Sequence, residues 1–169
     1  MDSRDLLSDA IERVGQGVHR LLEAVDERVL GFRPDPDANT IAWLVWHLTR
    51  GQDSQIADAY ELEQVWTSEG WVERFGLPFS SAAAGYGHSS EEVAAVRVPV
   101  HLLRSYYDAT QRVTLAQIAA TSDADLDRIV DRRWTPAVTL GVRLVSVMDD
   151  DMQHVGQAAY VRGVVLRKG

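Results

Sequence analysis

The sequence contains no cysteine. This absence excludes disulfide bonds, thiolate metal ligands and a cysteine nucleophile, so a metal site would have to use His, Asp or Glu. Long apolar runs are also lacking, because no stretch approaches the ~20 consecutive apolar residues that span a membrane. Residues 1–10 carry four charged side chains where an export signal needs an apolar segment. We therefore expect a cytoplasmic protein with no membrane partner.

Basic residues are in the minority. The chain has 17 Lys and Arg against 25 Asp and Glu, which gives a formal net charge of -8. This balance repels a phosphate backbone, and the basic residues form no stripe along the sequence, so we expect no nucleic-acid partner. The 169 residues, 46% of them hydrophobic, are enough to bury one core. We predict a single domain over residues 1–169.

Apolar residues recur at the i, i+3, i+4 spacing of amphipathic helices in four segments. They predict long helices over residues 4–30, 41–63 and 99–120, and a last helix that Thr139 caps and that runs to about residue 166. Ser3 can cap the first helix, and Asn39 or Thr40 can cap the second. No segment shows a convincing strand alternation. The pattern therefore indicates an all-α four-helix bundle.

The segments between the long helices are less regular. Residues 65–90 are rich in glycine and serine and predict a long, aromatic-rich loop between the second and third long helices. Its aromatic residues are Trp66, Trp71, Phe75, Phe79 and Tyr86. Ser89 is expected to cap a short helix. We expect residues 123–130 to form a single helical turn and residues 132–136 to be extended. Loops of this length in a compact domain are often binding loops or lids.

Three side chains could carry chemistry. Asp150 and His154 lie four residues apart, which places both on one face of the last helix. His47 borders the buried stripe of the second helix, so a bundle could bring all three together. Such a set suits zinc, iron, manganese, cobalt or nickel, and it leaves coordination positions open for a substrate. The spacing alone also fits an ordinary solvated helix face without a metal. If a metal is bound, the neighbouring acid Asp151 could replace Asp150 as a ligand.

The remaining histidines have weaker claims. His101 is expected on a helix exterior, and His88 follows a glycine in the long loop, so both are interpreted as solvated. His19 lies beside the polar side of the first helix and is given no role.

Two longer segments of the sequence resemble those of a known protein family. Residues 41–50 (IAWLVWHLTR) and 153–163 (QHVGQAAYVRG) resemble the DinB superfamily, and more narrowly its actinobacterial mycothiol S-transferase branch. Supporting strings are residues 33–39 (RPDPDAN), 85–89 (GYGHS) and 138–147 (VTLGVRLVSV). The likeness runs over nearly the whole chain.

The resemblance implies a bundle of the DinB type, a divalent metal in a three-residue site, and frequent homodimers. It also implies transfer of a low-molecular-weight thiol, here mycothiol, to a small electrophile, as in detoxification. Matched position by position, the family's metal-bearing residues fall on His47, Asp150 and His154. Many members have His where this chain has Asp150, which leaves the choice of ion open, with zinc as the first expectation.

Three further residues flank the expected ligands and are candidates for binding the thiol or the electrophile. Trp43 shares the helix face of His47 and could line an apolar wall. Arg50 and Gln157 each follow a ligand histidine by three residues, and could bind a polar part of the thiol or support the ligands.

Other functions remain open at this point. A mycothiol-dependent isomerase of the maleylpyruvate type would use a related metal-binding domain. Such enzymes generally carry an additional C-terminal domain, whereas the last expected helix runs almost to Gly169, so we expect this function less. A metal-dependent hydrolase is chemically accessible, although the sequence shows no additional general base for it. A non-catalytic bundle that binds a hydrophobic ligand or a partner protein would need no metal at all.

Overall fold

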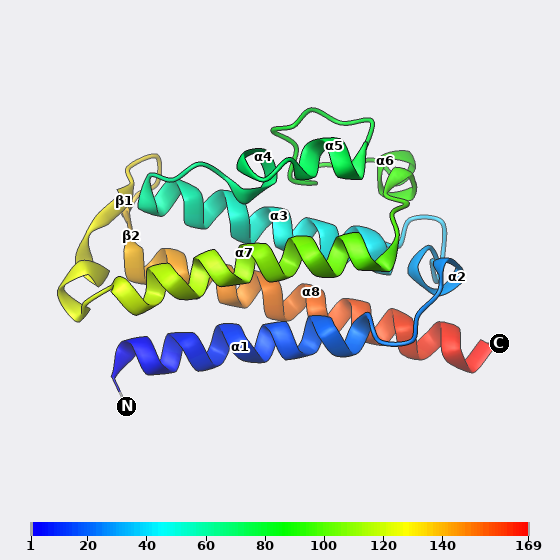
Figure 1. The fold of residues 1–169 in the computed structure, drawn as a ribbon, viewed down its shortest axis with the longest axis horizontal. Helices are drawn as coiled ribbons and strands as arrows, with labels where there is room; N and C mark the ends of the chain where they lie inside the picture. Colours follow the sequence, from blue (N-terminus) through cyan, green and yellow to red (C-terminus); the bar gives the residue numbers. More distant parts are fainter. Residues whose placement is uncertain (1, 169) are drawn as a thin grey trace.

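The computed structural model describes residues 2–168. Within them, four long helices lie side by side as a bundle: α1 (Ser3–Leu21), α3 (Ile41–Tyr60), α7 (Val100–Ala120) and α8 (Leu140–Lys168). Figure 1 shows them with the shorter elements gathered at the two ends and along one side. The mostly helical architecture confirms the predicted bundle.

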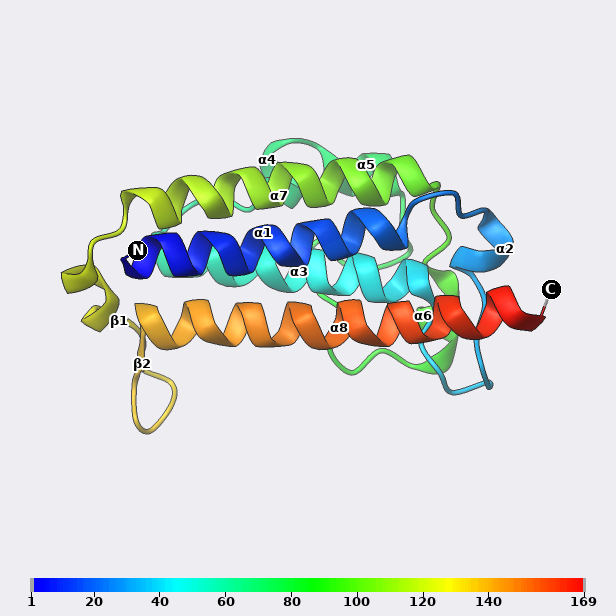
Figure 2. The ribbon, with the colours of Figure 1, turned by 90° about the horizontal axis from the view of Figure 1, so that it is seen from below.

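The direction of the helices explains the long connection. In Figures 1 and 2, α1 and α8 run one way, whereas α3 and α7 run the other way. Because α3 and α7 are parallel neighbours, the chain must return along the whole bundle between them. Residues 61–99 make this return and contain α4 (Val65–Ser68), α5 (Trp71–Phe75) and α6 (Ser90–Ala95). The predicted long loop is thus a crossover that holds two short helices before α6.

The core is built by the predicted apolar stripes. The positions predicted for α3, among them Ile41, Leu44 and Leu48, are buried, as are Leu144 and Val147 on α8. Helix α3 packs against both α7 and α8, and α1 packs against the same two helices. Helix α3 is enclosed from Ile41 to Asp53 on all sides, since α4, α5 and the following loop cover its outer face. The site described below lies along this enclosed stretch.

The helix starts follow local hydrogen bonding. Thr40 caps α3 by accepting the Trp43 amide at 3.0 Å, and Thr139 accepts the Val142 amide at 3.3 Å at the start of α8. Ser89 forms a capping box with Glu92 at the start of α6. These three caps confirm the predictions.

Two predictions for the first helix were wrong. The first helix ends at Leu21, and a separate α2 (Glu27–Leu30) follows, because Ala24 takes a left-handed backbone and Asp26 caps the new helix. Asp2, rather than Ser3, caps α1 through a capping box with Asp5.

The segment after α7 contains a small sheet that the sequence pattern missed. After the 3₁₀ turn η1 (Asp123–Asp127), β1 (Ile129–Asp131) pairs antiparallel with β2 (Val138–Thr139), and residues 132–136 form the bend between them rather than an extended run. Strands this short give no usable alternation. None of the helices formed by residues 2–168 is both long enough and apolar enough to cross a membrane.

Candidate metal centre

Three side chains meet between α3 and α8. His47 on α3, and Asp150 and His154 on α8, each offer a ligand atom, and these atoms all lie within 4.8 Å of one another. His154 Nε2 is 3.5 Å from Asp150 Oδ1, and the two imidazole rings lie edge to face with centroids 4.8 Å apart. Ligands about 2.1 Å from a shared ion are separated by roughly 3–4 Å, so small side-chain rotations would bring all three onto one ion.

The two histidine rings are oriented by acceptors on their Nδ1 side. His47 Nδ1 contacts the carbonyl oxygen of Ala84, and His154 Nδ1 is 3.1 Å from Oε1 of Gln157. A ring that donates from Nδ1 to an oxygen carries its free lone pair on Nε2. Metal-ligating histidines are usually held in this way. Gln157, a candidate for substrate binding, is therefore placed where it orients His154.

The charges within the site support one another. Burial lowers the pKa of His47, which is 4% exposed, and so favours the neutral imidazole that a metal needs. The hydrogen bond that His154 Nε2 donates to Asp150 lowers the pKa of Asp150 and raises the pKa of His154, so a metal ion bound here would replace the proton on Nε2. Asp150 is thus held as a carboxylate, and the cluster carries the anionic oxygen and the two nitrogens of the expected donor set.

One glycine, Gly85, makes room for this arrangement. A Cβ at Gly85 would lie 2.6 Å from His47 Nδ1 and 3.1 Å from Trp43 Cζ2, and Gly85 also has a φ of +98°. Only glycine fits there without displacing the loop or the ring. Gly51 lies one turn after His47, and a Cβ there would sit in ordinary contact with Asp150 Oδ2 at 3.5 Å. Close approach of the loop thus covers one side of His47.

Aromatic rings form the walls beside His47. Trp43 stacks on the imidazole at a centroid distance of 4.5 Å and an interplanar angle of 17°. Tyr86 meets the same ring edge to face at 5.1 Å, yet it is 68% exposed. Trp43 therefore lies beside the site as predicted from its spacing, although it is itself buried, and Tyr86 is the exposed ring at the mouth of the site.

Comparison with known proteins shows the family of the chain. The family model of the DinB superfamily matches residues 10–158, which includes all three clustered residues. The chain belongs to the DinB superfamily. This DinB protein is also similar to a solved structure described as the "conserved protein of locus from Enterococcus faecalis", with 32% sequence identity, a TM-score of 0.91 and 98% of each chain covered. A search of curated proteins gives no match.

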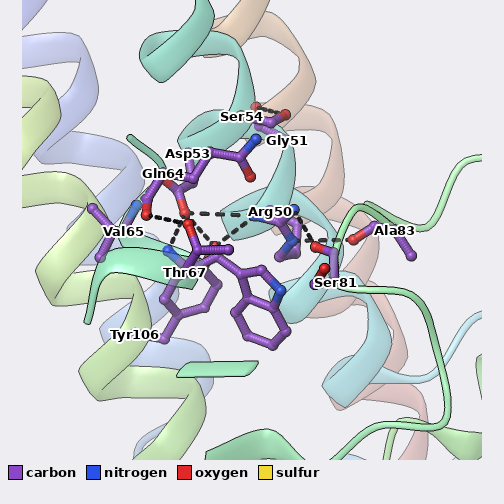
Figure 3. A network of polar contacts seen from close by, with 11 residues as sticks. Arg50, Gly51, Asp53, Ser54, Gln64, Val65, Thr67, Ser81, Ala83 and Tyr106 are labelled. Carbon is purple, nitrogen blue, oxygen red and sulfur yellow. Dashed lines mark hydrogen bonds and ion pairs between the residues drawn. The ribbon is translucent and has the colours of Figure 1, made fainter. Parts of the chain in front are cut away.

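Arg50 of this DinB protein lies in a buried polar network, shown in Figure 3. Its side chain is completely buried, 3.5 Å from Asp53 Oδ2, and Nη1 donates to the hydroxyl of Tyr106 at 3.2 Å. Asp53 in turn accepts from Tyr106 at 2.7 Å and from the backbone amides of Val65 and Trp66 at 2.8 Å. Burial raises the pKa of Asp53, and the hydrogen bonds and the guanidinium oppose that shift.

The same guanidinium also fixes the loop that covers the metal centre. Arg50 donates to the carbonyl of Ala83 at 3.1 Å and to that of Ser81 at 3.5 Å, next to the Ala84 carbonyl that contacts His47. With no exposed surface, Arg50 cannot touch a substrate in this conformation. The expected direct contact between Arg50 and a thiol is therefore replaced by a positioning role.

Two other sequence-based assignments were wrong. His88 is not a solvated loop residue, because its ring stacks on Trp46 at 5.6 Å and accepts the Trp43 indole at 3.2 Å. Asp151 is not a substitute ligand. It lies about 100° further around α8 than Asp150, which turns its carboxyl into the bundle, where it is completely buried. Burial raises the pKa of Asp151 well above its usual range, and this favours the neutral acid.

Several functional positions were missed by sequence reasoning. The Ala84 carbonyl, Gly85 and Tyr86 all come from the loop and meet His47 only because the crossover folds back over α3. The string GYGHS, residues 85–89, was the one available signal. Glycines on both sides of an aromatic residue indicate that the backbone turns tightly or passes close to another group. They do not indicate that this group is the ring of His47.

Proposed function

We propose that this DinB protein is a divalent-metal-dependent thiol S-transferase, with zinc as the ion and mycothiol as the thiol cosubstrate. The observation that carries the proposal is the convergence of His47, Asp150 and His154 from two helices onto one point. Two imidazoles and one carboxylate leave coordination positions for a further ligand, as catalytic rather than structural sites do. Nickel, manganese, iron and cobalt suit the same donor set.

The donor set fits a metal on the evidence of its surroundings. Both histidines have an oxygen acceptor at Nδ1, and Asp150 is kept ionised by His154. The site is also asymmetric in exposure. His47 is buried, whereas Asp150 and His154 are only half-buried, so solvent reaches the cluster from the side of the two α8 residues. A cosubstrate could approach from this side without any change in the core.

A bound divalent cation supplies stabilisation of a thiolate, which is the reactive form of a thiol in displacement and addition chemistry. The residues of the chain do the rest. Gln157 and the Ala84 carbonyl hold the two imidazoles. Transfer then forms a carbon–sulfur bond between the thiolate and the electrophile, and the electron pair moves to the leaving group or to the attacked double bond.

Tyr86 is the residue best placed to meet the electrophile. Its ring lies against His47 and remains largely exposed, so it offers an apolar face and a hydroxyl at the mouth of the site. Trp43 is stacked behind His47 and gives the imidazole a rigid backing. In this proposal Trp43 positions the ligand, and Tyr86 contacts the substrate.

Thiol transfer tests the proposal. Purified protein is loaded with Zn²⁺ and mixed with mycothiol and monochlorobimane, and bimane fluorescence is followed for wild type and His154→Ala. We expect metal-dependent conjugation above the uncatalysed rate, lost in the variant. Replacing mycothiol by cysteine shows whether the thiol is recognised. No conjugation by a metal-loaded wild type would overturn the transferase, and equal rates with both thiols would overturn the choice of mycothiol.

A further inference from the structure

A pocket lies away from the candidate metal centre, at the end of the bundle where α2 and α6 are found in Figure 1. Its volume is about 450 Å³, and its lining comes from α2, the start of α3, and the chain from α6 into α7. Pockets of roughly 300–1,000 Å³ are typical of small-molecule sites. None of the three clustered metal-site residues lines it.

One side of this pocket is apolar. The pocket is lined by Leu30 of α2, Ala42 of α3 and Ala94 of α6. It is also lined by three residues of the connection between α6 and α7, Val96, Val98 and Pro99. Several of these side chains are themselves buried parts of the core, so the wall is rigid. A preformed apolar wall of this kind suits a hydrocarbon or aromatic body.

The other side of the pocket carries positive charge in a protein whose net charge is -8. Three arginines line it, Arg28, Arg33 and Arg97, against the single acid Glu27. Arg28 and Arg97 are exposed. Within the described residues the side chain of Arg28 makes no hydrogen bond or ion pair, and the side chain of Arg97 makes only one, from Nε to the carbonyl of Ala94 at 3.2 Å. Their remaining donors are available to an anion.

Arg33 is held in place by hydrogen bonds from two of its three side-chain nitrogens. Its Nε donates to the Ala38 carbonyl at 2.5 Å and its Nη1 to Ser90 at 3.0–3.1 Å, which fastens the loop before α3 onto α6. The third nitrogen, Nη2, is enclosed and has no partner within the described residues. Arg33 therefore keeps its charge fixed in the wall of the pocket.

The starts of two helices lie at the pocket. Thr40 and Ala42, which line the pocket, belong to the first turn of α3, where the amides of Ile41 and Ala42 have no partner in the helix. Helix α7 starts at Pro99, which has no side chain able to cap it. Both helix starts add partial positive charge beside the arginines.

We propose that this pocket binds a small amphipathic anion, with an apolar body against the wall and one acidic group between Arg28 and Arg97. The pocket is open and preformed, and an anion there would meet two available guanidinium groups. The site does not depend on the metal centre. Its ligand binds whether or not the thiol transferase proposal is correct.

The probe for this site is 8-anilino-1-naphthalenesulfonate, which joins an aromatic body to a sulfonate. Fluorescence titration of the folded protein gives its dissociation constant, and N-phenyl-1-naphthylamine serves as the matched probe without charge. We expect the anionic probe to bind at least tenfold more tightly. In the double variant Arg28→Gln/Arg97→Gln the anionic probe should weaken about tenfold or more, because charge-assisted hydrogen bonds are lost, while the neutral probe should be unaffected.

The control variant Arg13→Gln/Arg132→Gln removes the same charge at two exposed positions outside the lining. It should bind the anionic probe like wild type, and so should His154→Ala, which alters only the metal centre. Circular dichroism checks that each variant is folded. Equal weakening in the two arginine double variants, or loss of the probe in His154→Ala, would overturn the proposal. Decanoate should displace the probe, and failure to do so would exclude a carboxylate as the acidic group.

Discussion

Replacing Gly85 with alanine gives the sharpest test of how the loop supports His47. The added Cβ would lie 2.6 Å from His47 Nδ1 and 3.1 Å from Trp43 Cζ2, so the loop must move away. A left-handed backbone costs a non-glycine residue about 1–2 kcal/mol, and relieving the overlap adds about 1–3 kcal/mol. We expect the free energy of unfolding of the metal-free protein to fall by about 2–5 kcal/mol, as measured by urea denaturation.

Gly87→Ala is the matched control. Gly87 also has a left-handed backbone, with a φ of +73°, but nothing lies within 4 Å of an added Cβ. It should lose only the backbone part, about 1–2 kcal/mol. Displacing the loop also removes the Ala84 carbonyl from His47, so the Zn²⁺ affinity should fall by about 10–100-fold in Gly85→Ala and stay unchanged in Gly87→Ala. Equal losses of stability and affinity in both variants would refute the reasoning.

Three further predictions concern other parts of the structure. Arg50→Met should lower the free energy of unfolding by about 3–5 kcal/mol in urea denaturation, because the buried Asp53 loses its cation, whereas Asp53→Asn combined with it should recover part of that loss. Asp131, whose pKa is held well below its usual range by Arg133, adds stability that is present above the acid range and is lost as the pH falls. Asp131→Asn should therefore flatten the pH dependence of the melting temperature between about pH 5 and pH 2, and an unchanged slope would contradict this. Tyr86→Ala should raise the apparent KM for the electrophile without changing the metal content, and unaltered kinetics would remove Tyr86 from the mouth of the site.

The sequence was sufficient for the parts of the fold that depend on local periodicity. The stripe through Ile41, Leu44 and Leu48 placed α3, and Thr40 fixed its start. The four-residue spacing of Asp150 and His154 is likewise a local property of one helix, and His47 could be assigned to the edge of a stripe. These features need no knowledge of distant contacts.

The remaining features depend on contacts between segments far apart in the sequence. Arg50 was expected to bind the thiol or to support the ligands, and its burial could not be foreseen because Tyr106, Ser81 and Ala83 reach it only when α7 and the crossover pack against α3. His88 was interpreted as solvated because the indole of Trp43 lies 45 residues away in sequence. The break at Ala24 is a single left-handed residue within an otherwise helical pattern, which periodicity does not detect.

The central claim is that His47, Asp150 and His154 together bind one divalent ion. The most direct measurement is elemental mass spectrometry of purified protein that has been reloaded with Zn²⁺ and desalted, for wild type, His47→Ala and the control His101→Ala, which changes an exposed histidine outside the cluster. The account predicts close to one ion per chain in wild type and in the control, and almost none in His47→Ala. Wild type without a stoichiometric ion, or equal metal content in all three proteins, would contradict it.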